Sequence, residues 1–190
     1  MIRKIKSQEE IDKKTKRNQR IVVSVMVFLI GFSSLGYAIM SREDSTSGAE
    51  IVKYGNLEFT NSNGFWTTTI SGKIFYFNNL PEDIKNVSIE GNYSSEEYFG
   101  NVLYFVNLNS QSNTVVNALQ DSALRMQEAC VLELSCTNQE LPIKNCSEDN
   151  IIIFKESSNS RVYRQERCVF IEGDLSASSD RFVYRLLNIA

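Results

Sequence analysis

The chain has 190 residues, of which 42% are hydrophobic and 23% charged, and it carries a formal net charge of −3. This length fits one folded domain with an appendage, and the ordinary charged content argues against disorder throughout. The sequence has no histidine, which excludes a Ser-His-Asp or Cys-His nucleophile and a His-ligated metal. It has no GxGxxG or GxxxxGK[ST] pattern, so we expect no dinucleotide or P-loop site and no cofactor.

The charge is spread unevenly along the chain. Residues 1–20 hold eight basic and three acidic side chains, a net charge of +5, so the other 170 residues carry −8. A strongly acidic remainder disfavours nucleic acid as a partner.

Residues 21–40 form an uncharged apolar run, IVVSVMVFLIGFSSLGYAIM. At about 1.5 Å per residue, twenty helical residues span about 30 Å, the thickness of the hydrocarbon core of a bilayer. The run predicts a transmembrane helix, with the lipid bilayer as its partner. Eight basic residues precede the run, and only Arg42 and Lys53 occur between residues 40 and 60. The positive-inside rule therefore predicts a cell-membrane protein with a cytoplasmic N-terminus and an extracytoplasmic C-terminal domain.

A cleavable signal peptide is the alternative interpretation of the apolar run. Gly36 and Ala38 have the small-residue spacing of a signal-peptidase site, so cleavage near Ala38 would release a secreted domain. The long basic region and the long apolar run favour an uncleaved signal-anchor.

The basic tail, residues 1–20, also has helical features. Ser7 and Glu10 fit a capping box, and acidic residues precede basic ones at i,i+4 spacing. Such a tail could recognise acidic lipids or a cytoplasmic protein, or it could serve only to fix the topology of the span.

After a polar linker at residues 41–50, residues 51–190 are long enough to fold as one extracytoplasmic domain. Strands are predicted at Leu57–Phe59, Phe65–Ile70 and Lys73–Phe77, joined by turns at 61–64 and 71–72. They form a β-meander.

The rest of the domain mixes strands and helices. A continuous apolar run predicts a central strand at 101–106, and helical periodicity predicts a helix over 115–129. The further predicted elements are a strand at 87–89, a buried strand at 151–154, a hairpin of 162–165 with 168–171, and a C-terminal helix at 179–189. This order predicts an α+β fold: a small mixed-sheet domain with a β-meander, a strand–helix–strand unit and a C-terminal helix.

All four cysteines fall in the predicted outer domain: Cys130, Cys136, Cys146 and Cys168. An even, clustered number outside the membrane indicates two disulfides. A Cys₄ metal site needs close CxxC pairs, whereas these separations are 6, 10 and 22 residues. Free buried thiols are the remaining alternative.

Four cysteines allow three pairings. Cys146 precedes one predicted strand and Cys168 opens another. Parallel strands on either side of an intervening one would bring both cysteines to one end of the sheet. This arrangement favours Cys146–Cys168, and leaves Cys130–Cys136 to link the end of the predicted helix.

Glycosylation sequons begin at Asn86, Asn92 and Asn145. With this content of Asn, Ser and Thr, about three sequons are expected by chance, so only the predicted compartment gives them meaning. Asn86 and Asn92 are the candidates, because Cys146 occupies the middle of the third sequon.

The acidic residues show no spacing that selects a catalytic pair. The sequence therefore predicts a membrane-anchored protein whose outer domain binds another membrane or extracytoplasmic protein, or acts as an accessory or scaffolding module. The alternatives are a membrane-tethered enzyme without histidine and a secreted domain.

Overall fold

The computed structural model describes Lys16 and residues 18–30, 50–132, 134, 136, 138 and 140–189. The chain divides into two units, Met1–Gly48 and Ala49–Ala190. In the first unit, Lys16 and residues 18–30 are helical. Within the described ranges, no helix is long and apolar enough to cross a membrane. Residues 31–40 of the expected span, the capping box at Ser7 and most of the linker lie outside those ranges.

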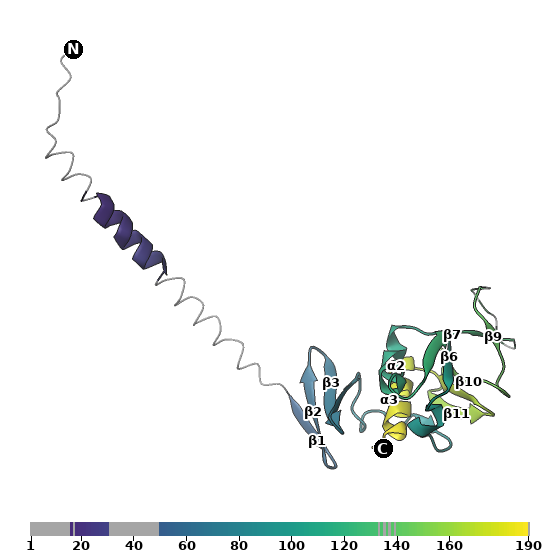
Figure 1. Cartoon of the computed structure of the whole chain (residues 1–190). Helices are drawn as coiled ribbons and strands as arrows, with labels where there is room; N and C mark the ends of the chain where they lie inside the picture. Colours follow the sequence, from purple (N-terminus) through teal and green to yellow (C-terminus); the bar gives the residue numbers. More distant parts are fainter. Residues whose placement is uncertain are drawn as a thin grey trace, which may run out of the picture. The chain divides into compact units, whose positions relative to one another are not determined.

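The second unit has a mixed α+β fold (Figure 1). Its first strands are β1 (Ile51–Tyr54), β2 (Leu57–Ser62), β3 (Phe65–Ile70), β4 (Lys73–Phe77) and β5 (Ser88–Ile89). Next come the 3₁₀ turn η1 (Ser95–Tyr98), β6 (Val102–Val106), the 3₁₀ turn η2 (Ser110–Ser112) and α2 (Asn113–Leu119). The remaining elements are β7 (Arg125–Glu128), β8 (Cys130–Val131), β9 (Ile143–Lys144), β10 (Asn150–Lys155), β11 (Arg161–Gln165), β12 (Cys168–Glu172) and α3 (Leu175–Leu186).

Strands β1 to β4 form an antiparallel meander in sequential order, which confirms the predicted meander. The turns at Asn63-Gly64 and Ser71-Gly72 have positive φ at both residues, as tight two-residue hairpin turns require. Strand β1 was not predicted. It is short and exposes Ile51, so neither burial nor a long alternating pattern marks it in the sequence.

The second sheet has six strands in the order β5-β11-β12-β10-β6-β7. Strands β12, β10, β6 and β7 run parallel, and β11 pairs antiparallel with β12 in the predicted hairpin. Strands β10 and β12 are direct neighbours in this sheet. The expectation that they lie on either side of an intervening strand was therefore wrong, because β11 lies outside the pair.

The helix predicted over 115–129 was wrong in its second half. Helix α2 ends at Leu119, and residues 125–128 form strand β7 beside β6. The helical spacing of Ala123 and Met126 predicts a continuing helix. In the structure, Ala123 packs on the core from an isolated β-bridge with Phe99, and Met126 packs on it from β7. Tertiary packing thus overrides a weak local periodicity.

The C-terminal helix is confirmed, but it begins earlier than the predicted residue 179. Asp174 is its N-cap, and its carboxylate accepts hydrogen bonds from the backbone amides of Ser176 and Ala177. Gly173 precedes the cap at φ 93°, where a side chain would clash with the backbone of Ser160. The sharp turn from β12 into α3 therefore requires glycine at this position.

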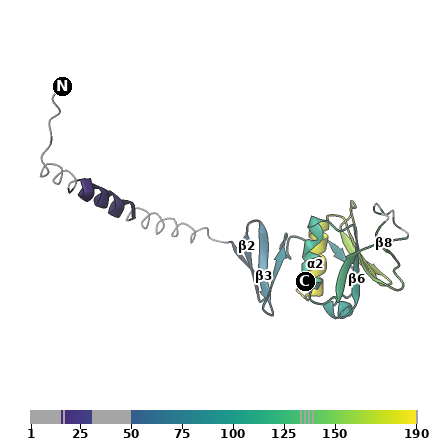
Figure 2. The same cartoon turned by 45° about the horizontal axis from the view of Figure 1, so that its top comes forward.

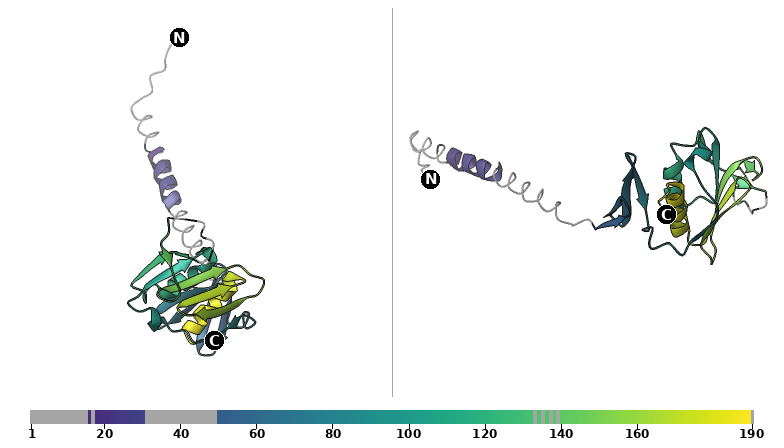
Figure 3. Two further views of the ribbon diagram at one scale, coloured as in Figure 1. Left: turned by 90° about the vertical axis from the view of Figure 1, so that its right-hand side faces the viewer. Right: turned by 90° about the horizontal axis from the view of Figure 1, so that it is seen from below.

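Helices α2 and α3 form a middle layer between the two sheets (Figures 2 and 3). One continuous core joins Phe59 and Phe77 of the meander, Phe182 and Tyr184 of α3, and the inward residues of the six-stranded sheet. The Tyr184 ring stacks on Phe77 with centroids 4.2 Å apart.

A buried carboxylate on α3 anchors the end of the meander. Asp180 is fully buried, and its Oδ2 accepts hydrogen bonds from the Asn78 and Asn79 backbone amides, each at 2.8 Å, and from Asn79 Nδ2 at 3.0 Å. The Tyr184 hydroxyl donates to the Asn79 carbonyl at 2.6 Å. Burial raises the pKa of Asp180 to about 6, although the hydrogen bonds from Asn79 and Asn78 favour the ionised form.

We predict that Asp180 makes folding stability depend on pH between about 4, the pKa of an unfolded Asp, and about 6. Because its pKa is higher in the folded than in the unfolded state, its contribution favours folding at low pH and is lost as pH rises through about 6. A shift of this size is worth at most about 3 kcal/mol. Asp180→Asn keeps an oxygen acceptor but cannot titrate, so it should flatten this dependence.

The measurement is the denaturation midpoint of the full chain in detergent at each pH. Unfolding is monitored by the fluorescence of Trp66, the single tryptophan. Asp174→Asn is the matched control, because Asp174 is exposed and asparagine caps a helix equally well. An Asp180→Asn variant with the same pH profile as the unmodified protein would contradict the assignment.

Candidate functional site

The two faces of the six-stranded sheet are covered differently. Alternate residues of β10 belong to different cores, since Ile152 and Phe154 face the helices while Ile151 and Ile153 face the other way. The second core defines the outer face of this sheet. It comprises Tyr104, Val106, Ala129, Val131, Ile151, Ile153 and Cys168, with Val102, Leu134, Cys146 and Phe170 packed against it.

Residues 130–149, here called the disulfide segment, contribute to this outer core. Its short strands β8 and β9 pair with each other in parallel. The structure contains two disulfides, Cys130–Cys136 and Cys146–Cys168, which is the pairing favoured from the sequence. Cys146–Cys168 ties the end of the segment to β12, where Cys168 is fully buried. Cys130 lies in β8, so the expectation that its disulfide links the end of a helix was wrong.

Polar contacts also fix the base of the disulfide segment. The Lys144 ammonium pairs with Asp149 at 3.1 Å and lies 4.3 Å from the centre of the Tyr104 ring. Hydrogen bonding with Tyr104 is the largest effect that raises the pKa of Lys144, and hydrogen bonding with Asp149 is the next, so the ammonium stays charged. Arg167 donates to the carbonyl of Glu148 at 2.8 Å. The Lys144–Asp149 pair lies within the segment, whereas the contacts with Tyr104 and Arg167 join it to the rest of the domain.

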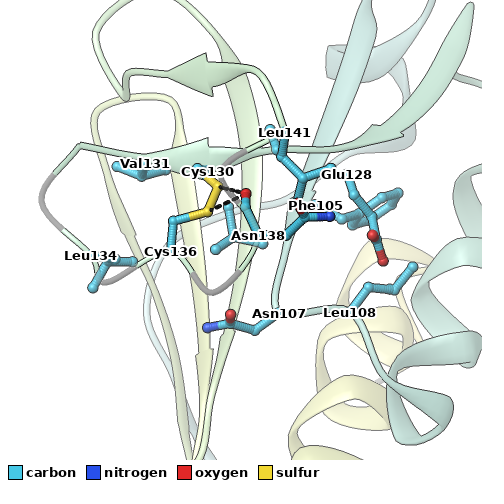
Figure 4. A pocket seen from close by; sticks show the side chains of 12 residues that line it. Phe105, Asn107, Leu108, Glu128, Cys130, Val131, Leu134, Cys136, Asn138 and Leu141 are labelled. Carbon is cyan, nitrogen blue, oxygen red and sulfur yellow. Dashed lines mark hydrogen bonds between the residues drawn. A yellow bond between two sulfur atoms is a disulfide. The ribbon is translucent and has the colours of Figure 1, made fainter.

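A small cavity of about 180 Å³ lies on the β6–β7 side of the segment (Figure 4). Phe105, Leu108 and Leu141 contribute apolar walls, and the Cys130–Cys136 disulfide lies beside the Asn138 carbonyl oxygen. That oxygen is 3.1 Å from Cys136 Sγ and 3.5 Å from Cys130 Sγ. Disulfide sulfurs carry no proton, so these are polar contacts and not hydrogen bonds.

A larger cavity of about 650 Å³, here called the groove, lies between the segment and strands β10 to β12. Its floor is apolar, with Val131, Ile153 and Phe170, while Leu132 is 77% exposed. Polar residues also line it: Lys144, Asn145, Ser147, Gln165 and Glu166. An apolar floor with a few hydrogen-bonding groups is the composition of a binding site.

A charged cluster lies at the far end of β12. Glu172 is 2% exposed and accepts hydrogen bonds from Arg161 Nε at 2.8 Å and from the Tyr163 hydroxyl at 3.0 Å. Lys155 lies 3.7 Å away. Burial opposes ionisation of Glu172, but these donors outweigh it and lower its pKa. The Tyr163 ring stacks on Phe170 at 4.9 Å, which connects this cluster to the groove.

Three further acidic residues have structural partners. Glu97 pairs with Arg164, Asp149 pairs with Lys144, and Asp174 caps α3. Among the described residues, no group of three Asp, Glu, Cys or His side chains could hold a metal ion.

The candidate glycosylation residues Asn86 and Asn92 lie away from the groove. Both are exposed and flank β5, the edge strand opposite β7. Asn145 lines the groove, and its side-chain oxygen accepts hydrogen bonds from the amides of Ser147 and Glu148.

Sequence reasoning missed the groove residues Gln165, Glu166 and Phe170. One signal could have found Phe170: in a strand that begins at Cys168, alternation places Phe170 on the same face as the disulfide. No family model, curated protein or solved structure matches the chain. The candidate site therefore rests on its own geometry.

We predict unequal contributions from the two disulfides. Replacing Cys146 and Cys168 together by alanine should lower the free energy of unfolding by about 3 kcal/mol, because a 22-residue separation is opened. The same change at Cys130 and Cys136 opens a separation of 6 residues and should cost about 2 kcal/mol. Denaturant titration of the full chain measures both.

Alkylation of the unreduced protein provides the control. We expect no reactive thiol, and Cys130→Ser should release only Cys136. Four reactive thiols in freshly isolated protein, or release of Cys168 by Cys130→Ser, would contradict the disulfide arrangement.

Proposed function

We propose that the chain is a single-pass membrane protein whose outer domain binds a partner protein. The uncharged run at 21–40 supports an anchor, and the excess of basic residues before it supports a cytoplasmic N-terminus. Two disulfides in the second unit suit an extracytoplasmic or secreted domain.

The groove is the observation that carries the binding proposal. Its floor presents Val131, Ile153 and Phe170, while Asn145 and Gln165 supply hydrogen-bonding groups. The Cys146–Cys168 disulfide fixes one wall to the floor, which lowers the ordering cost of binding. This combination suits an extended segment of a partner protein, with apolar side chains on the floor and main-chain groups at the rim.

Binding is favoured over catalysis because two acidic residues near the groove already have structural roles, and Glu166 is the one carboxylate among the described residues that line it. Glu172 is held by Arg161 and Tyr163, and Asp149 is held by Lys144. A general acid or base needs a carboxyl group that faces substrate at a suitable pKa.

We predict the topology from the charge asymmetry. In intact cells, a membrane-impermeant thiol reagent should label an engineered cysteine at Ser45 and should not label one at Ser7. The four native cysteines are in disulfides and provide an unlabelled background. The opposite labelling pattern would contradict the orientation. A mature N-terminus near Ile39 by mass spectrometry would instead establish the secreted form.

We predict that Leu132→Asp weakens partner binding at least tenfold, since it places a charge beside the apolar floor of the groove. The variant should still fold, because Leu132 is 77% exposed. The measurement is the crosslinking yield, in native membranes, of a full chain with a photoreactive amino acid at Gln165.

Leu124→Asp is the matched control, since Leu124 is 73% exposed and does not line the groove. Equal crosslinking yields from the two variants would contradict binding in the groove. Robust turnover of a common hydrolase substrate by the full chain would favour the enzyme alternative.

A further inference from the structure

The outer face of the meander is an exposed surface separate from the groove. Thr68 of β3 is buried, and side chains alternate along a strand, so its neighbours Thr67 and Thr69 point outward. Strand register extends this alternation over the sheet. The outer face comprises Ile51, Lys53, Glu58, Thr60, Ser62, Phe65, Thr67, Thr69, Ile74 and Tyr76.

Apolar side chains gather at the end of this face where β1 begins, here called the proximal end. Because neighbouring strands are antiparallel, the start of β1 lies at the same end of the sheet as the end of β2, the start of β3 and the end of β4. Ile51, Phe65 and Tyr76 all lie at this end and are 48–59% exposed. The charged residues of the face, Lys53 and Glu58, pair at 2.9 Å further toward the opposite end. The face is therefore apolar at the proximal end and polar at the other.

The chain enters the meander at the proximal end. The uncharged run ends at residue 40 and β1 begins at Ile51, so residues 41–50 connect them. The Glu50 carbonyl accepts a hydrogen bond from the Asn61 amide, which joins the connection to the sheet at this end. Ten residues span at most about 35 Å. Once the run is inserted in a bilayer, this length confines the proximal end close to the lipid surface, a step that rests on the anchor proposed above.

We propose that the proximal end of this face docks on the lipid surface of the membrane that holds the anchor. Phe65 and Tyr76 enter the interfacial layer, where aromatic side chains are favoured because their rings leave water while polar groups stay hydrated. Ile51 and Ile74 add apolar area, on which interfacial binding depends. The connection to the anchor makes this contact intramolecular, so a small apolar patch suffices.

The charge of the face selects the class of lipid. Lys53 and Glu58 neutralise each other, and the exposed Glu50 adds one negative charge beside the proximal end. Acidic headgroups are therefore not attracted, and the contact depends on apolar burial in a zwitterionic surface.

Docking through the meander leaves the groove accessible. The helices and the six-stranded sheet lie between the meander and the outer core that borders the groove (Figure 3). The groove thus lies on the side of the domain away from the docked face, where a partner protein can reach it.

The test uses the full chain in phosphatidylcholine vesicles, with a polarity-sensitive fluorophore on an engineered cysteine at Ser62. This position is exposed on the outer face at the proximal end, and the native cysteines are in disulfides. We expect lipids that carry a spin label near the headgroup to quench the fluorophore about twofold or more. The same fluorophore at Glu166, in the exposed turn between β11 and β12, should show no such quenching.

Phe65→Ser together with Tyr76→Ser removes both aromatic rings from the proximal end and should abolish the quenching at Ser62. Leu124→Ser is the matched control, because Leu124 is 73% exposed and lies outside the meander, so quenching should be unchanged. The denaturation midpoint checks the folding of each variant. Ile51→Ser, at a 59% exposed position, replaces the double variant if that variant fails to fold, and it should also reduce the quenching.

The anchor and the docking can fail separately. Loss of the full chain from the vesicles in an alkaline wash would show that the anchor is wrong, and docking with it. A retained chain whose Ser62 fluorophore stays in water overturns docking alone. A fluorophore that leaves water without being quenched by lipid is covered by protein, such as a second copy, and this also overturns docking. Quenching that requires phosphatidylserine would overturn the apolar contact.

Discussion

The attachment of the meander to the rest of the domain depends on one buried carboxylate as well as on the shared core. Asp180 lies on α3 in the middle layer. Its carboxylate accepts hydrogen bonds from the backbone amides of Asn78 and Asn79, where the chain leaves the meander. A buried polar group of this kind is costly without partners, so its position fixes the path of the chain more narrowly than apolar contacts alone. Tyr184 of the same helix adds two contacts to this part of the chain: its hydroxyl donates to the Asn79 carbonyl, and its ring stacks on Phe77. The meander is therefore held to α3 by directional contacts as well as by the shared core.

The two faces of the six-stranded sheet differ in role, since one packs in the main core and the other carries the candidate site. Its inner face packs on the helices, while its outer face carries the disulfide segment and the groove. The alternation of side chains along β10 and β12 allows both faces to be buried from the same strands. Ile153 and Phe170 of the groove floor belong to this sheet, and one disulfide joins the groove wall to β12, which limits movement of the groove.

Local patterns predicted the meander, the β11–β12 hairpin and the C-terminal helix, because Phe65–Ile70 and Lys73–Phe77 are rich in β-branched and aromatic residues and lie between tight turns. The boundary between α2 and β7 could not be predicted, since Ala123 and Met126 are buried by partners distant in the sequence. The cysteine count predicted disulfides, but the groove depends on which strands become neighbours. The parallel contact of β10 with β12 is set by the packing of the whole sheet, and residue spacing does not encode it.

The position of α3 has a consequence for the order of events during synthesis. The ribosome makes both sheets before it makes Leu175–Leu186, yet this helix lies between them. Until α3 emerges, Phe59 and Phe77 on the meander and the inner residues of β10 lack the larger of the two helices that cover them. The nascent domain therefore exposes two apolar sheet faces that could pair with each other or with neighbouring chains. Closure of the core must wait for α3, so these apolar faces stay incompletely covered until that helix is made.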